Sequence, residues 1–217
     1  MFAVSCSFIL AQDYKDVLKE RKATQKLTKA ELNEKASKYA KKAAKDYAKE
    51  GWQVAPGQLP LEKQLDRTYL MQYEFDDNML PKYIMSEAMS IGQNYDAAKI
   101  QAIELAKMNL AGLIQTQVAA LTESTVANEQ LSAEQAASIT RSVTASKSAI
   151  SQKLGRVVTV LECYRVLKNK NKEVRIQIAY NQQMAYEAAA AAIKQDLEKQ
   201  GINLHNELNQ MLNIGAK

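Results

Sequence analysis

The chain has 217 residues, of which 47% are hydrophobic and 24% charged, which is enough for one domain with a hydrophobic core. Seven glycines and three prolines are too few for a collagen-like or linker-rich chain, and no apolar run approaches the roughly 20 residues that span a bilayer. Two cysteines and one histidine exclude a disulfide scaffold, a structural zinc site and a histidine-dependent catalytic triad.

The chain begins with a ten-residue apolar segment, Phe2–Ala11, which ends at a polar run. Its length is typical of the apolar core of a secretory signal peptide, with Ala11 at the cleavage position. No charged residue precedes it, so we expect the true start to lie upstream. Ala3–Cys6 resembles a lipobox, which makes Cys6 a lipidation candidate, and an uncleaved buried segment is a third interpretation. The first two interpretations predict export from the cytoplasm.

Residues 12–58 are interpreted as a basic helical arm. Between Asp13 and Glu50 the sequence has 12 Lys/Arg and 7 Asp/Glu, so the whole net charge of +5 lies here. A capping box at Thr28 and Glu31 predicts a helix that ends at Gly51, with an Ala/Tyr stripe on one side. The other side carries candidate contacts for an anionic partner, although i,i+4 Glu–Lys pairs also fit a solvated face: Lys38, Lys41, Lys42, Lys45 and Lys49.

Residues 59–181 are expected to form the folded domain. Pro60 is a typical first helical residue and predicts a helix that fades at Asp76. Side chains alternate over residues 82–91, which predicts a strand. One face of this strand carries Tyr83, Met85, Glu87, Met89 and Ile91, and the other face carries Ile84, Ser86, Ala88 and Ser90.

The longest predicted helix begins at Asn94 or Asp96 and reaches about Leu121. A polar hinge from Glu123 follows, and then a second helix over residues 133–154. The apolar stripe of the longest helix is predicted to consist of eight residues: Ala97, Ile100, Ile103, Ala106, Leu110, Leu113, Ile114 and Val118.

Residues 156–167 and 173–180 are the clearest strands, and the polar turn between them predicts a hairpin. Alternation places Val158, Val160, Tyr164 and Val166 on one face. Residues 182–217 are interpreted as carboxyl-terminal helices. The sequence thus predicts an α+β fold: a small antiparallel sheet, made of one strand plus a hairpin, packed by long helices and with helical extensions at both ends.

This order of elements supports a comparison with known families. Tyr83–Ala88 leads into the helix that contains Asp96 and Ala97, and the last strand includes Val174–Ile178. The pattern resembles the lipoprotein-20 family of bacterial envelope proteins, which is related to the amino-terminal domain of the flagellar T-ring protein. The resemblance covers about residues 83–181. It implies a non-enzymatic envelope protein, and no catalytic residue is carried over.

Few side chains are candidates for chemistry. Glu87 and Glu162 lie in predicted strands and are considered as an acid/base pair, but no nucleophile, glycine-rich loop or metal-ligand set accompanies them. Cys163 alternates with leucines and is interpreted as a buried thiol. We therefore expect no catalytic, cofactor or metal site.

The sequence as a whole predicts a non-enzymatic, exported protein of a Gram-negative cell envelope, in the periplasm or associated with the outer membrane. We expect a structural or protein-interaction role. Its expected partners are envelope proteins, further copies of itself or an anionic membrane surface, and not nucleic acid. The alternative is a periplasmic holdase-type chaperone, whose basic helical arms clamp unfolded clients.

Overall fold

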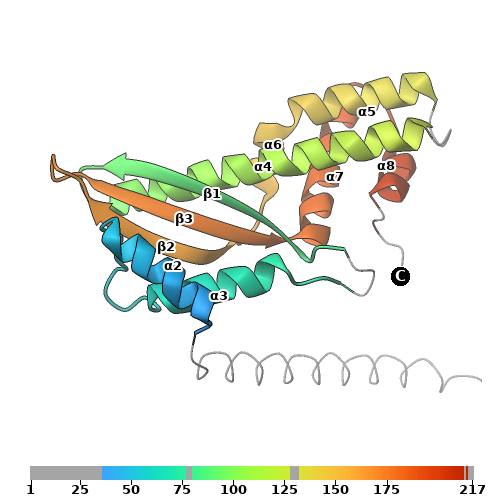
Figure 1. Ribbon diagram of the computed structural model, residues 1–217. Coiled ribbons are helices and arrows are strands. Elements are labelled where there is room, and N and C mark those ends of the chain that lie inside the picture. The colour runs from blue at the N-terminus through green and yellow to red at the C-terminus, as the bar shows by residue number, and fades with distance from the viewer. Residues whose placement is uncertain (1–35, 77–79, 128–131, 213, 215–217) are drawn as a thin grey trace, which may run out of the picture. The chain divides into compact units, whose positions relative to one another are not determined.

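The computed structural model describes residues 36–76, 80–127, 132–212 and 214 (Figure 1). One compact unit spans Tyr39–Lys217, and the other, Met1–Lys38, lies almost wholly outside the described residues. The α+β class expected from the sequence is confirmed. The described elements follow one another in this order: α2 (Lys38–Lys49), α3 (Leu61–Gln72), β1 (Tyr83–Gly92), α4 (Tyr95–Ala127), α5 (Ala133–Ala145), α6 (Lys147–Lys153), β2 (Val158–Val166), β3 (Lys172–Asn181), α7 (Gln182–Lys199) and α8 (His205–Met211).

The sheet has the strand order β1-β3-β2, and both pairings are antiparallel. β2 and β3 form the predicted hairpin, whose turn contains Lys170 at a φ of 66°. β1 pairs with β3 in one continuous register, from Tyr83 opposite Asn181 to Gly92 opposite Lys172. The single strand plus hairpin predicted from the sequence is therefore the observed sheet.

A β-bulge in β2 changes which of its side chains share a face. The pairing with β3 shifts between Thr159 and Leu161, so Val160 has no partner in the register. Because one extra residue reverses the alternation, Val158 faces the opposite side of the sheet from Tyr164. The prediction that one apolar face runs along the whole strand is wrong at its start, since a bulge leaves no mark in an apolar pattern.

α4 crosses one face of the sheet through small side chains (Figure 1). Ala98, Ala102 and Ala106 are fully buried, and the Ser86 hydroxyl of β1 donates a hydrogen bond to the carbonyl of Ala106 over 2.7 Å. A Cβ atom added to Gly92 would lie only 2.9 Å from the backbone nitrogen of Ala98. Small residues on both elements therefore let the helix backbone approach β1 closely.

The buried stripe of α4 differs from the predicted one. Ala97, Ile100 and Leu113 were expected inside, but all three are exposed, Ile100 by 64%. The small residues that touch the sheet carry the contact, so the bulkier side chains of this half point to solvent. The helix also continues past Glu123, where the hinge was expected to begin, to Ala127, and residues 128–131 of that expected hinge lie outside the described residues. The observed stripe follows i,i+4 spacing: Ala98, Ala102, Ala106, Leu110, Ile114 and Val118.

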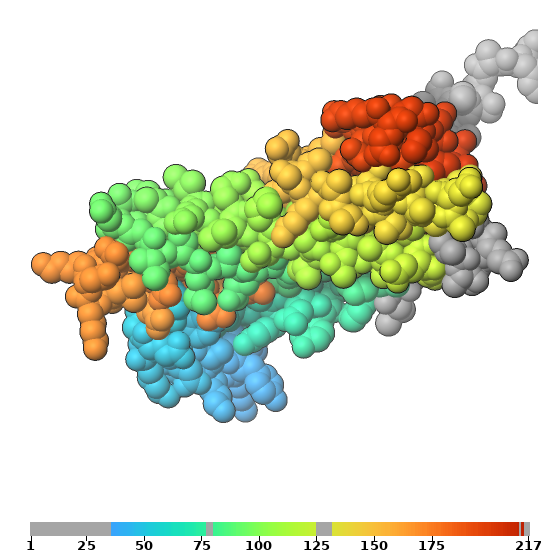
Figure 2. Space-filling view, turned by 90° about the horizontal axis from the view of Figure 1, so that it is seen from above, coloured from blue at the N-terminus to red at the C-terminus, as the bar shows by residue number. Residues whose placement is uncertain are grey.

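The second half of α4 leaves the sheet and packs with α5, α6, α7 and α8, which gather along that end of the helix in Figure 2. The single helix predicted over residues 133–154 is two helices. The break falls at Ser146, whose hydroxyl donates to the Val143 carbonyl over 2.7 Å at the end of α5. The apolar centre of this part includes large, fully buried side chains: Ile139, Ile150, Ile193, Leu197 and Leu208.

The opposite face of the sheet is covered by α2 and α3 (Figure 1). α3 begins after Pro60 as predicted and packs against β2. Leu65 of α3, Leu161 of β2 and Trp52 in the α2–α3 link are buried on this side. The sheet is thus enclosed between α4 on one face and the α2–α3 segment on the other.

Candidate functional site

The lysines predicted to contact an anionic partner lie along α2. Lys42, Lys45 and Lys49 are exposed, and their spacing of three and four residues places them on one side of the helix. Lys38, the first residue of α2, is also exposed, whereas Lys41 is half-buried. Lys38 is aligned with them but belongs to the other compact unit, so Lys42, Lys45 and Lys49 alone are called the lysine face below.

Little negative charge offsets the lysine face in the part of the chain that the structure describes. Lys49 Nζ lies 2.7 Å from Asp46 Oδ1, and this hydrogen bond holds the pKa of Asp46 below its ordinary value. Both side chains are at least half exposed, so the pair adds little to stability. Lys42 and Lys45 form no ion pair with any described residue. The lysine face therefore keeps a net positive charge.

The inner side of α2 and the link after it hold the lysine face outward. Ala40 is fully buried on the side of α2 away from the lysines. Gly51 ends the helix at a φ of 86°, a conformation that glycine adopts without strain. Trp52 is then 4% exposed, and Gln53 exchanges two backbone hydrogen bonds of 2.8 Å with Tyr164 of β2. The link is thus bonded directly to the edge of the sheet.

Two arginines of the sheet stack on aromatic rings of this segment. The Arg165 guanidinium carbon lies 4.6 Å from the centre of the Trp52 ring, and that of Arg175 lies 5.1 Å from the Tyr47 ring. Such cation–π contacts are worth about 0.5–2 kcal/mol each, more where water is excluded. Each guanidinium also pairs with a carboxylate of a neighbouring strand, at 2.6 and 2.7 Å: Arg165 with Glu173 and Arg175 with Glu87.

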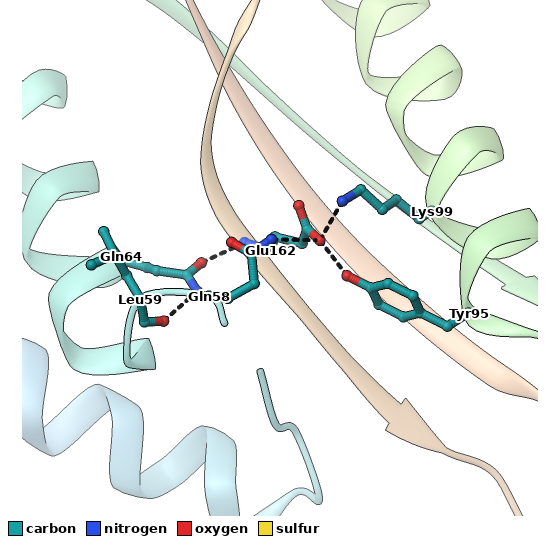
Figure 3. A network of polar contacts seen from close by, with 6 residues as sticks. All are labelled: Gln58, Leu59, Gln64, Tyr95, Lys99 and Glu162. Atoms are coloured by element: carbon teal, nitrogen blue, oxygen red, sulfur yellow. Dashed lines mark hydrogen bonds and ion pairs between the residues drawn. The ribbon is translucent and has the colours of Figure 1, made fainter. Parts of the chain in front are cut away.

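A second group of polar side chains surrounds Glu162 of β2, on the face that α4 covers (Figure 3). Glu162 is 5% exposed. Its Oε1 accepts hydrogen bonds from Lys99 Nζ at 2.7 Å, from the Tyr95 hydroxyl and from Gln58 Nε2 at 3.4 Å. Its backbone N–H donates to Gln64 Oε1 over 2.7 Å. These five residues are called the Glu162 cluster below.

Local structure explains why Tyr95 and Lys99 reach the same carboxylate. Asn94 caps α4 by accepting a hydrogen bond from the Ala97 N–H over 2.8 Å, which fixes the first turn. Tyr95 and Lys99 are four residues apart and so lie on one side of that turn. The Tyr95 ring packs edge-on against Tyr164 of β2, with 5.1 Å between the ring centres.

The chemistry of the Glu162 cluster is that of a structural polar network. Burial raises the pKa of the Tyr95 phenol, and its hydrogen bond to Glu162 raises it further, so the phenol is protonated at neutral pH. Lys99 balances the charge of the carboxylate. The donors converge on one oxygen from α4 and from the link before α3, and the cluster therefore ties both segments to β2.

The carboxylates considered as an acid/base pair do not meet. Glu87 lies opposite Gln177 of β3, and Glu162 lies opposite Ile176, the adjacent residue. Because adjacent side chains of a strand point to opposite faces, the two carboxylates are on different sides of the sheet. Cys163 is fully buried, as expected, and burial raises the pKa of its thiol to about 12, so it is protonated and a poor nucleophile.

The structure does not describe one predicted site, and it adds two residues to another. Cys6, the lipidation candidate, and the apolar segment around it lie outside the described residues. Tyr95 and Lys99 were not predicted from the sequence as partners of Glu162. The charge of Glu162 inside an apolar strand could have indicated such partners, because a buried carboxylate requires a cation or several hydrogen-bond donors.

Comparisons with known proteins add no name to these sites. No family model, no curated protein and no solved structure matches the chain. Within the described ranges, no three His, Cys, Asp or Glu side chains are grouped so that they could hold a metal ion. None of the helices described here combines the length and the apolar character that a bilayer span requires.

Proposed function

We propose that this chain is a non-enzymatic, exported protein of the bacterial cell envelope with a structural or protein-interaction role. Its lysine face would be the contact with an anionic membrane surface. The observation that carries the proposal is the lysine face itself, which presents exposed like charges on a helix fixed to the sheet by Arg165 and Arg175.

The energetics of the lysine face fit a reversible contact. A lysine close to an anionic lipid surface contributes about 1 kcal/mol, so three give about 3 kcal/mol. This attraction is screened over a Debye length of about 10 Å at 0.1 M salt. The contact would therefore be weak alone, steeply dependent on salt, and suited to orienting the protein at a surface.

Several arrangements support a role other than catalysis. The Glu162 carboxylate is engaged with Lys99 and Tyr95, and the Cys163 thiol is buried and protonated. Glu87 is paired with Arg175 on the other face of the sheet. The acidic and nucleophilic groups considered from the sequence are thus used to hold the fold together.

The proposed location in the envelope rests on the sequence. The apolar segment Phe2–Ala11 has the length of a signal-peptide core, and residues 83–181 resemble the lipoprotein-20 family. Fractionation of the native organism, with mass spectrometry of the amino terminus, tests this part. Cleavage after Ala11 or a lipidated Cys6 is expected in the envelope fraction, and an intact Met1 in the cytoplasm would refute export.

Vesicle sedimentation tests the lysine face. The full chain should bind vesicles that contain phosphatidylglycerol more strongly than vesicles of phosphatidylcholine, and binding should fall as salt rises. Replacing Lys42, Lys45 and Lys49 by Gln should reduce binding at least tenfold.

A control variant makes the same change of charge elsewhere. Lys153, Lys168 and Lys199 are exposed and lie on other parts of the fold, so their replacement by Gln should leave most of the binding intact. Equal losses in the two variants would show that net charge alone drives binding. No binding by the full chain at low salt would show that the lysine face is simply a solvated helix surface.

A further inference from the structure

The two outer edges of the sheet differ in how many hydrogen bonds other segments of the chain make to them. The outer edge of β2 is capped: Tyr164 exchanges two backbone hydrogen bonds with Gln53, and the N–H of Glu162 donates to the Gln64 side chain. β1 forms the other edge, and no strand among the described residues lies beyond it (Figure 1). The free edge of β1 is therefore the place where the sheet could grow.

The hydrogen-bond register shows which residues of β1 point their backbone outward. Leu167 and Asn171 are bonded across the hairpin, so the odd-numbered residues of β3 bond to β2 and the even-numbered ones bond to β1. Their partners in β1 are also even-numbered, for example Ala88 opposite Ile176. The N–H and C=O groups of the odd-numbered residues of β1 consequently face away from the sheet.

These outward groups are almost unpartnered among the described residues. The Asn109 side chain of α4 donates to the Glu87 carbonyl over 3.0 Å. The outward backbone groups of Met85, Met89 and Ile91 have no hydrogen-bond partner in the described part of the chain. A row of free groups at every second residue matches one kind of occupant, an extended strand.

Neither the sequence of β1 nor its surroundings protect this edge. Within β1, Glu87 is the only charged residue, and the strand has neither a proline nor a bulge. Natural edge strands usually carry such protection. Leu105 and Leu113 lie one turn of α4 before and after Asn109, on the side of the helix that reaches the edge, and they are 42% and 45% exposed. An apolar flank therefore runs beside the free backbone.

We propose that β1 pairs antiparallel with β1 of a second copy of this chain, which joins the two sheets into one. A second copy is the occupant that fits, because a free strand edge beside an exposed leucine flank is self-complementary about a two-fold axis: the free groups of one β1 meet those of the other, and the leucines of one α4 meet those of the other. A two-fold axis through Ala88 puts Glu87 opposite Met89 of the other copy, so the like charges do not meet. Met85 then lies opposite Ile91.

The same axis accounts for the exposed leucines. Each copy keeps its own α4 on the same face of the joined sheet, where the even-numbered side chains of β1 after Ile84 are small. The two α4 helices would approach side by side, with Leu105 and Leu113 of each copy between them. Asn109 would exchange its bond to Glu87 for contacts in this interface.

The test compares a backbone change with a side-chain change at one position. The full chain should have twice its monomer mass of 24.2 kDa by light scattering at high concentration. Met89→Pro removes an outward N–H and keeps the bonds to β3, so it should be monomeric with unchanged circular dichroism. Met89→Thr keeps the N–H and should stay dimeric.

A second variant tests the same interface without a change in the strand, so the result does not depend on whether the proline disturbs β1. Leu105→Lys combined with Leu113→Lys leaves the backbone untouched, places like charges between the two copies and should also give a folded monomer. A wild-type chain that is monomeric at high concentration would overturn the proposal. A dimer whose mass is unchanged by both the proline and the double lysine variants would show that another surface forms it.

Discussion

Removing Lys99 should destabilise the protein more than neutralising Glu162, although these two side chains form one ion pair. The Glu162 side chain is 7% exposed and that of Lys99 is 30% exposed. Lys99→Met leaves a carboxylate that cannot reach water. Glu162→Gln leaves an ammonium group that can turn outward, while the new amide still accepts from Tyr95. Because Glu162 is more deeply buried than Lys99, losing Lys99 should lower the free energy of unfolding more than neutralising Glu162.

The expected magnitudes follow from this geometry. Leaving a buried charge without its partner lowers the free energy of unfolding by about 3–5 kcal/mol. Tyr95 and Gln58 still donate to Glu162, so we expect a loss of about 2–3 kcal/mol for Lys99→Met. Glu162→Gln should cost about 1 kcal/mol, the value of an ordinary hydrogen bond. The double variant leaves no unpaired buried charge and should be more stable than Lys99→Met alone.

Urea unfolding followed by the fluorescence of Trp52, the sole tryptophan, measures these losses. Lys107→Met is the matched control, because Lys107 pairs with the exposed Glu104 on the same helix at 3.0 Å and should cost less than about 0.5 kcal/mol. Equal losses for Lys99→Met and Glu162→Gln that add in the double variant would refute the reasoning. They would mean that water reaches Glu162.

Two further predictions concern β2. Val160→Asp should lower the free energy of unfolding by several kcal/mol, because Val160 is 3% exposed. Val158→Asp, at a site 38% exposed, should lower it by less than about 1 kcal/mol. Similar melting temperatures for the two variants would contradict the burial of Val160. Cys163 has a thiol pKa raised from 9.0 to about 12, so only the unfolded chain ionises between these values and stability should fall as pH rises through this window. Cys163→Ala should show a shallower fall in urea midpoints over the same window, and an unchanged slope would contradict burial of the thiol.

The strands could be predicted from the sequence because each combines alternating side chains with bounding turn residues, and β-branched residues are frequent in β2 and β3. The bulge at Val160 could not, since it depends on how β2 is fitted between β3 and the α2–α3 link. In α4 the sequence predicted a stripe that includes the bulky Ile100, whereas the observed stripe includes Ala98. Contact with small residues of β1 selected alanine, and this choice is made only in the assembled fold.

The lysine face was predictable because it depends on helical spacing alone. The Glu162 cluster was not, although the carboxylate in an apolar strand was visible. Its partner Lys99 is 63 residues away in the chain, and many lysines were equally available. Only the placement of α4 over β2 brings them together.

The strand at the centre of the sheet is the last one in the chain. Among the described elements, β1 is separated from its strand neighbour β3 by α4, α5, α6 and β2. The local hairpin can form within microseconds once β3 exists, but β1 must wait until the long intervening segment has closed into a loop. During synthesis, the edge of β1 that pairs with β3 therefore stays without its partner strand until the chain has been made as far as Asn181. β1 is therefore the strand of this sheet that stays unpaired longest while the chain is made, and an unpaired strand edge is prone to aggregate in that interval.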